Sequence, residues 1–140
     1  MSCYLDTSIL ISMIMKDAGS ARVDAWLDSS NEALHVSAWA MAEFAAVLWR
    51  RQRNREIADT APAAAILELE SWAANFAVRL GLSASAGDAA SILAKRPDLK
   101  LSAPDALHLA LAVQAGLTLV TSDLRLAKAA RSQDHPVLVP

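Results

Sequence analysis

Short apolar runs alternate with helical segments along almost the whole chain, and this alternation limits the possible fold more than any other feature. Ser2 to Leu5 is a strand-like run that ends at Asp6-Thr7-Ser8, three residues that favour helix caps and turns. Leu117 to Thr121 repeats the pattern, because Asp123 follows it at the start of another helical segment. Strands that alternate with helices form parallel βαβ units. We therefore predict an α/β fold with three layers (α/β/α), in which helices cover both faces of a central parallel sheet of four to five short strands.

Apolar periodicity and cap residues predict the remaining elements. We expect further strands at residues 34–37, 82–84 and 136–139, of which 82–84 has the weakest signal. We expect helices at residues 9–15, 20–27, 39–52, 62–80, 87–95, 102–115 and 123–130. The chain has 140 residues, of which 54% are hydrophobic. This is enough for one well-packed domain and too little for two, so we predict a single domain that spans residues 1–140.

Four carboxylates border apolar runs, where an unpaired charge is unfavourable. They are Asp6, Glu43, Asp105 and Asp123. Burying an unpaired carboxylate costs several kcal/mol, and no basic residue lies three or four positions from Glu43 to neutralise it along a helix. In a parallel sheet, segments that follow the carboxyl ends of the strands meet at one edge. We expect the four acids to converge there and to share a divalent cation, although Asp6 and Asp123 also suit helix caps.

Carboxylate oxygens are the ligands that Mg²⁺ and Mn²⁺ prefer, so we predict Mg²⁺ as the cofactor, with Mn²⁺ as an alternative. The single cysteine and the three histidines show no zinc-ligand spacing. A divalent cation activates water and neutralises charge on a phosphoryl oxygen, so phosphodiester hydrolysis is the natural reaction for such a site. The net charge of −2 argues against sequence-wide affinity for nucleic acid but leaves local basic patches open.

Two further groups of residues are candidates for supporting roles. Thr7, Ser8 and Thr121 are hydroxyl residues next to the acids, where they could hold a carboxylate or a cation-bound water; ordinary turn formation is an equal alternative. Arg50, Arg51 and Arg53 could bind an RNA backbone through phosphate contacts; a solvated helix end is the alternative. We interpret His108, one turn after Asp105, as a histidine satisfied by helix packing and leave it out of the catalytic set.

The order of four short motifs resembles the PIN-domain family, and within it the VapC-type toxins. The motifs are Leu5-Asp6-Thr7-Ser8, Ala42-Glu43-Phe44, Ser102-Ala103-Pro104-Asp105-Ala106-Leu107-His108 and Val120-Thr121-Ser122-Asp123. The resemblance implies a Mg²⁺- or Mn²⁺-dependent endoribonuclease that hydrolyses RNA with a metal-activated water and leaves a 5′-phosphate and a 3′-hydroxyl. It implies that Asp6, Glu43, Asp105 and Asp123 are both the catalytic residues and the metal ligands.

The resemblance also implies partners. A VapB-like antitoxin would block the site, as in a type II toxin–antitoxin pair, and the chain would form a homodimer or a higher toxin–antitoxin assembly. Residues 50–87 match the family least well. Two alternatives remain open: a PIN-like interaction module without catalysis, and a Mg²⁺-binding phosphoacceptor signalling domain, which would need a lysine near the acids. The chain has no signal-peptide pattern and no apolar run long enough to span a bilayer, so we expect a cytoplasmic protein without membrane contact.

Overall fold

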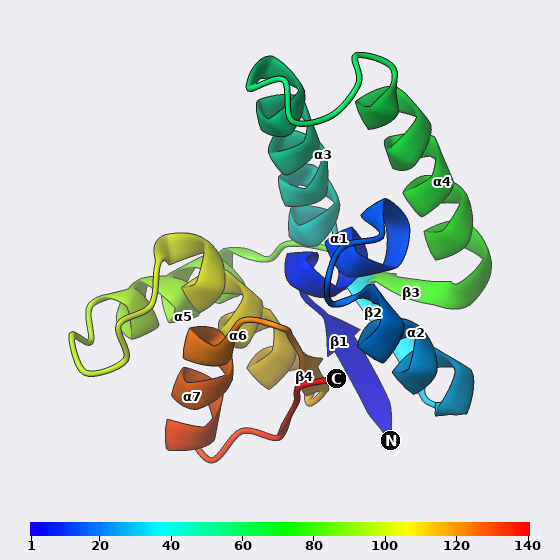
Figure 1. The fold of residues 1–140 in the computed structure, drawn as a ribbon. Coiled ribbons are helices and arrows are strands. Elements are labelled where there is room, and N and C mark those ends of the chain that lie inside the picture. Colours follow the sequence, from blue (N-terminus) through cyan, green and yellow to red (C-terminus); the bar gives the residue numbers. More distant parts are fainter.

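The computed structural model describes residues 1–140, and in it five parallel strands form one sheet between two layers of helices (Figure 1). The strands are β1 (Ser2–Leu5), β2 (Ala33–Ser37), β3 (Ala77–Leu80), β4 (Thr118–Val120) and β5 (Val137–Leu138). Their order in the sheet is β3-β2-β1-β4-β5, and every neighbouring pair is parallel. The predicted fold class is confirmed.

Seven helices connect and flank these strands. They are α1 (Thr7–Met15), α2 (Ser20–Ser29), α3 (Ala38–Arg53), α4 (Ala61–Phe76), α5 (Ala84–Ala94), α6 (Ala103–Ala115) and α7 (Leu124–Ser132). None of them is long and apolar enough to cross a membrane. In Figure 1, α3 and α4 stand side by side and extend away from the sheet, whereas α5, α6 and α7 gather at its opposite side.

The central strand β1 divides the apolar core into two parts, because successive side chains of a strand point to opposite faces. Cys3 and Leu5 pack with α1, α2, α3 and α4 on one face of the sheet. Tyr4 points to the other face, where it packs with buried residues of α5, α6 and α7. All three side chains are fully buried. Two apolar layers on one sheet explain why β1 lies at its centre.

Polar caps start the helices that follow the carboxyl ends of the strands. Asp6 caps α1, Ser37 caps α3 and Asp123 caps α7, each with a side-chain oxygen that accepts a backbone N–H of the first turn. Such caps satisfy N–H groups that have no partner inside the helix. Ser102 starts α6 in the same way, and Gly116 ends it with a φ of 64°, a conformation that glycine adopts without strain. The caps fix where each polar side chain enters the space above the sheet.

One predicted strand is wrong, and the helix before it is shorter than expected. Residues 82–84 do not form a strand; the third strand is β3, and α4 ends at Phe76 instead of continuing to Leu80. β3 pairs along the whole of its length with β2, with Leu34 opposite Ala77 and Ser37 opposite Leu80. Without β3, the outer edge of β2 would present unpaired backbone groups. The need to pair that edge outweighs the helical periodicity of residues 77–80, which include the β-branched Val78.

Candidate active site

The sheet order places two of the predicted acids at a topological switch point. From β1 the chain adds β2 and β3 on one side, and it then returns to add β4 and β5 on the other. The connections after β1 and β4 therefore leave the sheet in opposite directions and open a crevice, which is where open α/β sheets bind ligands. Asp6 directly follows β1, and Asp123 lies just beyond β4. Local capping and global topology thus bring the two carboxylates to one place.

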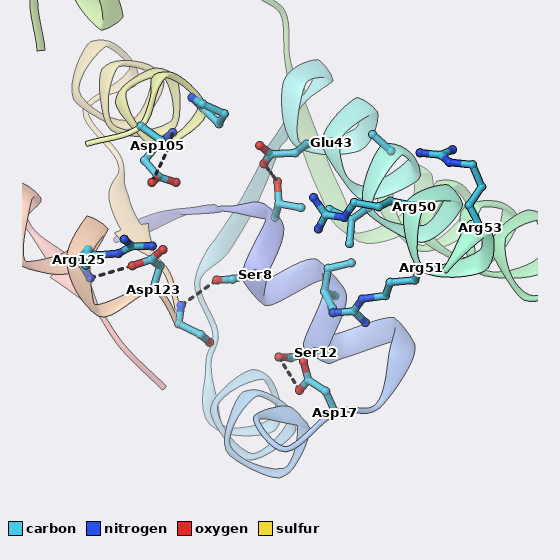
Figure 2. A pocket seen from close by; sticks show the side chains of 17 residues that line it. Ser8, Ser12, Asp17, Glu43, Arg50, Arg51, Arg53, Asp105, Asp123 and Arg125 are labelled. Carbon is cyan, nitrogen blue, oxygen red and sulfur yellow. Dashed lines mark hydrogen bonds between the residues drawn. The ribbon is translucent and has the colours of Figure 1, made fainter. Parts of the chain in front are cut away.

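An open cleft of about 850 Å³ lies at this edge of the sheet (Figure 2). Three of the four predicted acids line it, namely Glu43 from α3, Asp105 from α6 and Asp123 at the start of α7. Two of the predicted hydroxyl residues, Thr7 and Ser8, also line it. The lining further includes Ser12, Asp17, Ser102, Ser122, Arg50, Arg51, Arg53 and Arg125. Residues from four separate helices therefore contribute polar groups to one hollow.

Asp6 lies beneath the cleft and is 3% exposed. Its Oδ1 accepts hydrogen bonds from the Ser8 hydroxyl (2.6 Å) and the Ile9 amide (3.2 Å), and its Oδ2 accepts one from the Thr121 hydroxyl (2.5 Å). Burial raises the pKa of Asp6, and the nearby His108 and these hydrogen bonds oppose the rise without cancelling it. No basic side chain forms an ion pair with Asp6. The site thus contains a buried acid that lacks a positive partner.

Glu43 is held by two groups on the same oxygen atom. Its Oε1 accepts a hydrogen bond from the Thr7 hydroxyl, and it lies 2.8 Å from Nε2 of His108. Burial alone would raise the pKa of Glu43, but the hydrogen bonds from His108 and Thr7 outweigh it and lower the pKa. Glu43 is therefore a carboxylate near neutral pH. Its second oxygen, Oε2, has no hydrogen bond within the protein, so this atom is available to a ligand.

Asp105 and Asp123 are anchored at the first turns of their helices. The Ser102 hydroxyl donates to Oδ2 of Asp105 (2.7 Å), while Oδ1 of Asp123 accepts the amide of Arg125 (2.7 Å) and that of Leu126 (3.2 Å). Neither carboxylate has a basic partner. In Figure 2 both lie on the wall of the cleft opposite Glu43. The predicted cap at Asp123 therefore does not prevent this residue from facing the cleft.

The donor set of the cleft fits a hard divalent cation. Its lining offers carboxylate and hydroxyl oxygens and contains neither cysteine nor histidine. Mg²⁺ and Mn²⁺ prefer such oxygen ligands, and a cation would also compensate the buried charge of Asp6. However, no three acidic, imidazole or thiol side chains lie close enough together to hold one ion directly. The predicted four-carboxylate site therefore stays a prediction, and it requires the carboxylates on opposite walls of the cleft to move closer together.

Basic side chains flank the acids on two sides. Arg50, Arg51 and Arg53 belong to the last turn of α3, and Figure 2 shows them beyond Glu43. Arg125 lies on the other side, next to Asp123. None of the four forms an ion pair with another residue. Their guanidinium groups are therefore free to contact an anionic ligand that enters the cleft.

Several residues of this site were not predicted from the sequence, and two of them bear on its chemistry. Arg125 gave no signal because it is an isolated basic residue on an amphipathic helix. His108 was interpreted as a packing residue, and it is indeed 2% exposed, but it contacts Glu43 directly. Only its position one turn after Asp105 could have indicated this contact, since residues three or four apart lie on the same face of a helix.

Comparisons with known proteins identify the family of the chain and proteins of similar fold. The family model described as PIN domain matches residues 3–132. Among curated proteins, no sequence matches significantly. Among solved structures, the VapC20 toxin of Mycobacterium tuberculosis, described as cleaving the sarcin-ricin loop, has a TM-score of 0.73 and 16% identity, with 91% of this chain and 95% of that chain covered.

Two complexes are also similar in structure. VapBC2 of Rickettsia felis, bound to a DNA fragment from its promoter, has a TM-score of 0.70 and 18% identity, with 100% of this chain and 99% of that chain covered. A toxin–antitoxin complex from Klebsiella pneumoniae has a TM-score of 0.60 and 19% identity, with 87% of each chain covered. These likenesses concern the fold, whereas the family model covers nearly the whole sequence. The chain belongs to the PIN domain family.

Proposed function

We propose that the protein is a metal-dependent endoribonuclease that hydrolyses RNA phosphodiester bonds and acts as the toxin of a type II toxin–antitoxin pair. The observation that carries this proposal is the cleft at the switch point of the sheet, where three acids lie between one arginine and a group of three arginines, none of which forms an ion pair. Two of these acids, Asp105 and Asp123, have no basic partner. Acids in this position fit cation-assisted chemistry, and the arginines fit a phosphate backbone. Family membership supports a nuclease, and the similarity in fold to VapC20 supports RNA as the substrate.

We propose Asp6, Glu43, Asp105 and Asp123 as the catalytic residues and as the ligands of Mg²⁺, with Mn²⁺ as an alternative. The chemistry that the cation supplies when bound is the activation of water and the neutralisation of phosphoryl charge. Ser8 and Thr121 fix both oxygens of Asp6, so the orientation of this carboxylate is set before any ligand arrives. Thr7 has the corresponding role for Glu43.

We assign binding of the RNA backbone to the arginines of the cleft. Arg50, Arg51 and Arg53 would contact phosphates on one side of the bond to be cleaved, and Arg125 would contact them on the other side. This arrangement reads charge and not base sequence, because guanidinium groups recognise phosphate oxygens in any nucleotide. Target choice would then depend on other contacts, for which the rest of residues 50–87, which include α4 and β3, are the candidates.

A cleavage assay tests the proposed activity. The purified protein should cleave end-labelled RNA in Mg²⁺ or Mn²⁺, should not cleave it in EDTA, and should leave 5′-phosphate ends. Asp105→Asn should reduce the rate by at least 100-fold, whereas Asp88→Asn, which changes an exposed acid on α5 outside the cleft, should not. Equal rates for the two variants, or cleavage that persists in EDTA, would contradict the proposal.

We further propose a VapB-like antitoxin as the natural inhibitor and a homodimer as the basic assembly. The support for a partner is the toxin–antitoxin complex among the similar folds. The gene should adjoin a small reading frame, and co-expression with it should yield a stable complex without RNase activity. Light scattering should give the mass of two chains for the isolated protein. A chain that purifies as a monomer and is unaffected by that neighbour would refute both parts.

The two alternative functions are less well supported. A phosphoacceptor domain would need a lysine near the acids, and no lysine lines the cleft. An interaction module without catalysis would have no need for several acids that lack basic partners. No specific observation favours either alternative.

A further inference from the structure

His108 connects the floor of the cleft to a buried chain of polar groups. It lies on α6, and its ring makes contacts with three other residues. Nδ1 is 2.7 Å from the Tyr4 hydroxyl, while Nε2 is 2.8 Å from Oε1 of Glu43 and 3.2 Å from the Thr7 hydroxyl. The Tyr4 hydroxyl also lies 2.8 Å from that of Ser37. Both ring nitrogens are thus engaged with groups from other elements of the fold.

Counting donors and acceptors determines the position of the proton on Nε2. Oε1 of Glu43 accepts the hydrogen bond from the Thr7 hydroxyl, so this oxygen is an acceptor, and the Thr7 hydroxyl has no second proton to donate. Thr7 can therefore only accept from His108. Because both neighbours of Nε2 are acceptors, Nε2 must carry a proton, and this holds for the neutral and the charged imidazole alike.

The same counting of donors and acceptors determines which group donates in each hydrogen bond of the buried series. In the neutral ring Nδ1 is an acceptor, so the Tyr4 hydroxyl donates to it. The Tyr4 oxygen then accepts from Ser37, whose own oxygen accepts the amide of Ala40 (2.9 Å) at the start of α3. In each hydrogen bond from Ser37 to Glu43, the donor is therefore the group farther from Glu43 in the series and the acceptor is the nearer one. This series of hydrogen bonds begins and ends on α3, so it connects the imidazole ring of His108 on α6 to the helix that carries Glu43.

We infer that His108 is a positioning residue, which donates its Nε2 proton to Oε1 of Glu43 and so directs the free Oε2 toward the cation site of the cleft. Any buried histidine needs partners for both ring nitrogens. What distinguishes His108 is that the partner of its Nε2 is an acid of the cleft, whose other oxygen has no hydrogen bond within the protein. This inference rests on the proposed function, because it assigns His108 a role through a proposed cation ligand. Groups that orient metal ligands typically change metal affinity by about 10- to 100-fold when they are removed.

Two substitutions of similar size separate positioning from packing. His108→Gln places an amide nitrogen near the position of Nε2, so it can still donate to Glu43. His108→Asn is shorter, reaches only toward Tyr4 and leaves Glu43 without this donor. Both variants disturb the buried chain and should lower the melting temperature. Only His108→Asn should weaken Mn²⁺ binding, by at least 10-fold in titration calorimetry, while His108→Gln should stay within about threefold of the unmodified protein.

The Glu43→Gln variant and ¹⁵N NMR distinguish failure of the inference about His108 from failure of the proposed cation site. If the unmodified protein binds Mn²⁺, Glu43→Gln weakens binding and both His108 variants bind normally, the inference is overturned while the proposed cation site survives. If Mn²⁺ does not bind at all, the proposed function fails, and the ¹⁵N spectrum of the metal-free protein decides the inference by itself. A protonated Nε2 whose signal shifts in Glu43→Gln supports it. An unprotonated Nε2 refutes it.

Discussion

We predict that Asp6→Asn stabilises the protein in the absence of metal. The amide oxygen of asparagine can replace Oδ1, so the hydrogen bonds from Ser8 and the Ile9 amide remain, and asparagine is as good a helix cap as aspartate. The amide nitrogen replaces Oδ2 and can donate to the Thr121 oxygen once that hydroxyl turns. What the substitution removes is a buried negative charge without a basic partner.

The sign and size of the effect follow from proton linkage. Burial raises the pKa of Asp6 in the folded state above its unfolded value of about 3.9. The folded state therefore holds this proton more tightly, and the contribution of Asp6 to stability falls as the pH rises through the interval between the two pKa values. Within this interval the advantage of Asp6→Asn should grow by up to about 1.4 kcal/mol per pH unit, and it should be constant above it.

Urea unfolding of both proteins in EDTA, from pH 3.5 to 8, measures this difference. At neutral pH the variant should be more stable, by about 3 °C in melting temperature for each kcal/mol gained. Saturating Mn²⁺ should reverse the order, since a ligand at 100 times its Kd stabilises the protein that binds it by about 2.7 kcal/mol. A loss of stability of 1 kcal/mol or more that is the same at every pH would refute the reasoning and assign Asp6 a purely structural role.

The remaining predictions concern the cleft. Changing Arg50, Arg51 and Arg53 together to Gln should reduce the slope of log affinity against log salt for single-stranded RNA by about 2, whereas Arg131→Gln, outside the cleft, should leave it nearly unchanged; filter binding at several salt concentrations would show this. Glu43→Gln should destabilise the metal-free protein near neutral pH, because the lowered pKa of Glu43 stabilises the folded state above about pH 4.3, and urea unfolding should show the difference shrinking as the pH falls below that value. Mn²⁺ should weaken an antitoxin complex in calorimetry at constant ionic strength, if an antitoxin arginine occupies the same carboxylates; an affinity independent of Mn²⁺ would show that the partner binds elsewhere.

Local signals in the sequence were sufficient for most of the fold. β1 and the cap of α1 were predictable because a short, largely apolar run is followed at once by a capping aspartate, although α1 begins at Thr7, two residues before the predicted start. β3 was not predictable in the same way, because what makes residues 77–80 a strand is the free edge of β2, which lies more than 40 residues earlier in the chain. The apolar periodicity of a segment depends only on the residues of that segment. It contains no information about a distant strand whose free edge the segment pairs with.

The candidate site shows the same limit. Glu43 was identifiable because no local ion pair could explain a carboxylate there. The contacts of His108 were not, since its partners Tyr4 and Glu43 are 104 and 65 positions away. The apolar run before Asp6 indicated that this carboxylate borders the core, but its nearly complete burial follows from β1 being the central strand of the sheet. Residue types thus indicated the chemistry, while the roles within it depended on long-range packing.

The position of β1 between β2 and β4 has a consequence for synthesis of the protein. Cys3 pairs with Leu34 on one side and with Thr118 on the other, so the centre of the sheet is incomplete until residues 118–120 have left the ribosome. Asp6 and Glu43 emerge early, whereas Asp105 and Asp123 emerge late. A product that stops between Glu43 and Asp105 therefore carries only two of the four candidate acids and cannot form the cleft. For the proposed nuclease, products that stop before β4 would be harmless to cellular RNA, and activity would require synthesis to continue past Asp123.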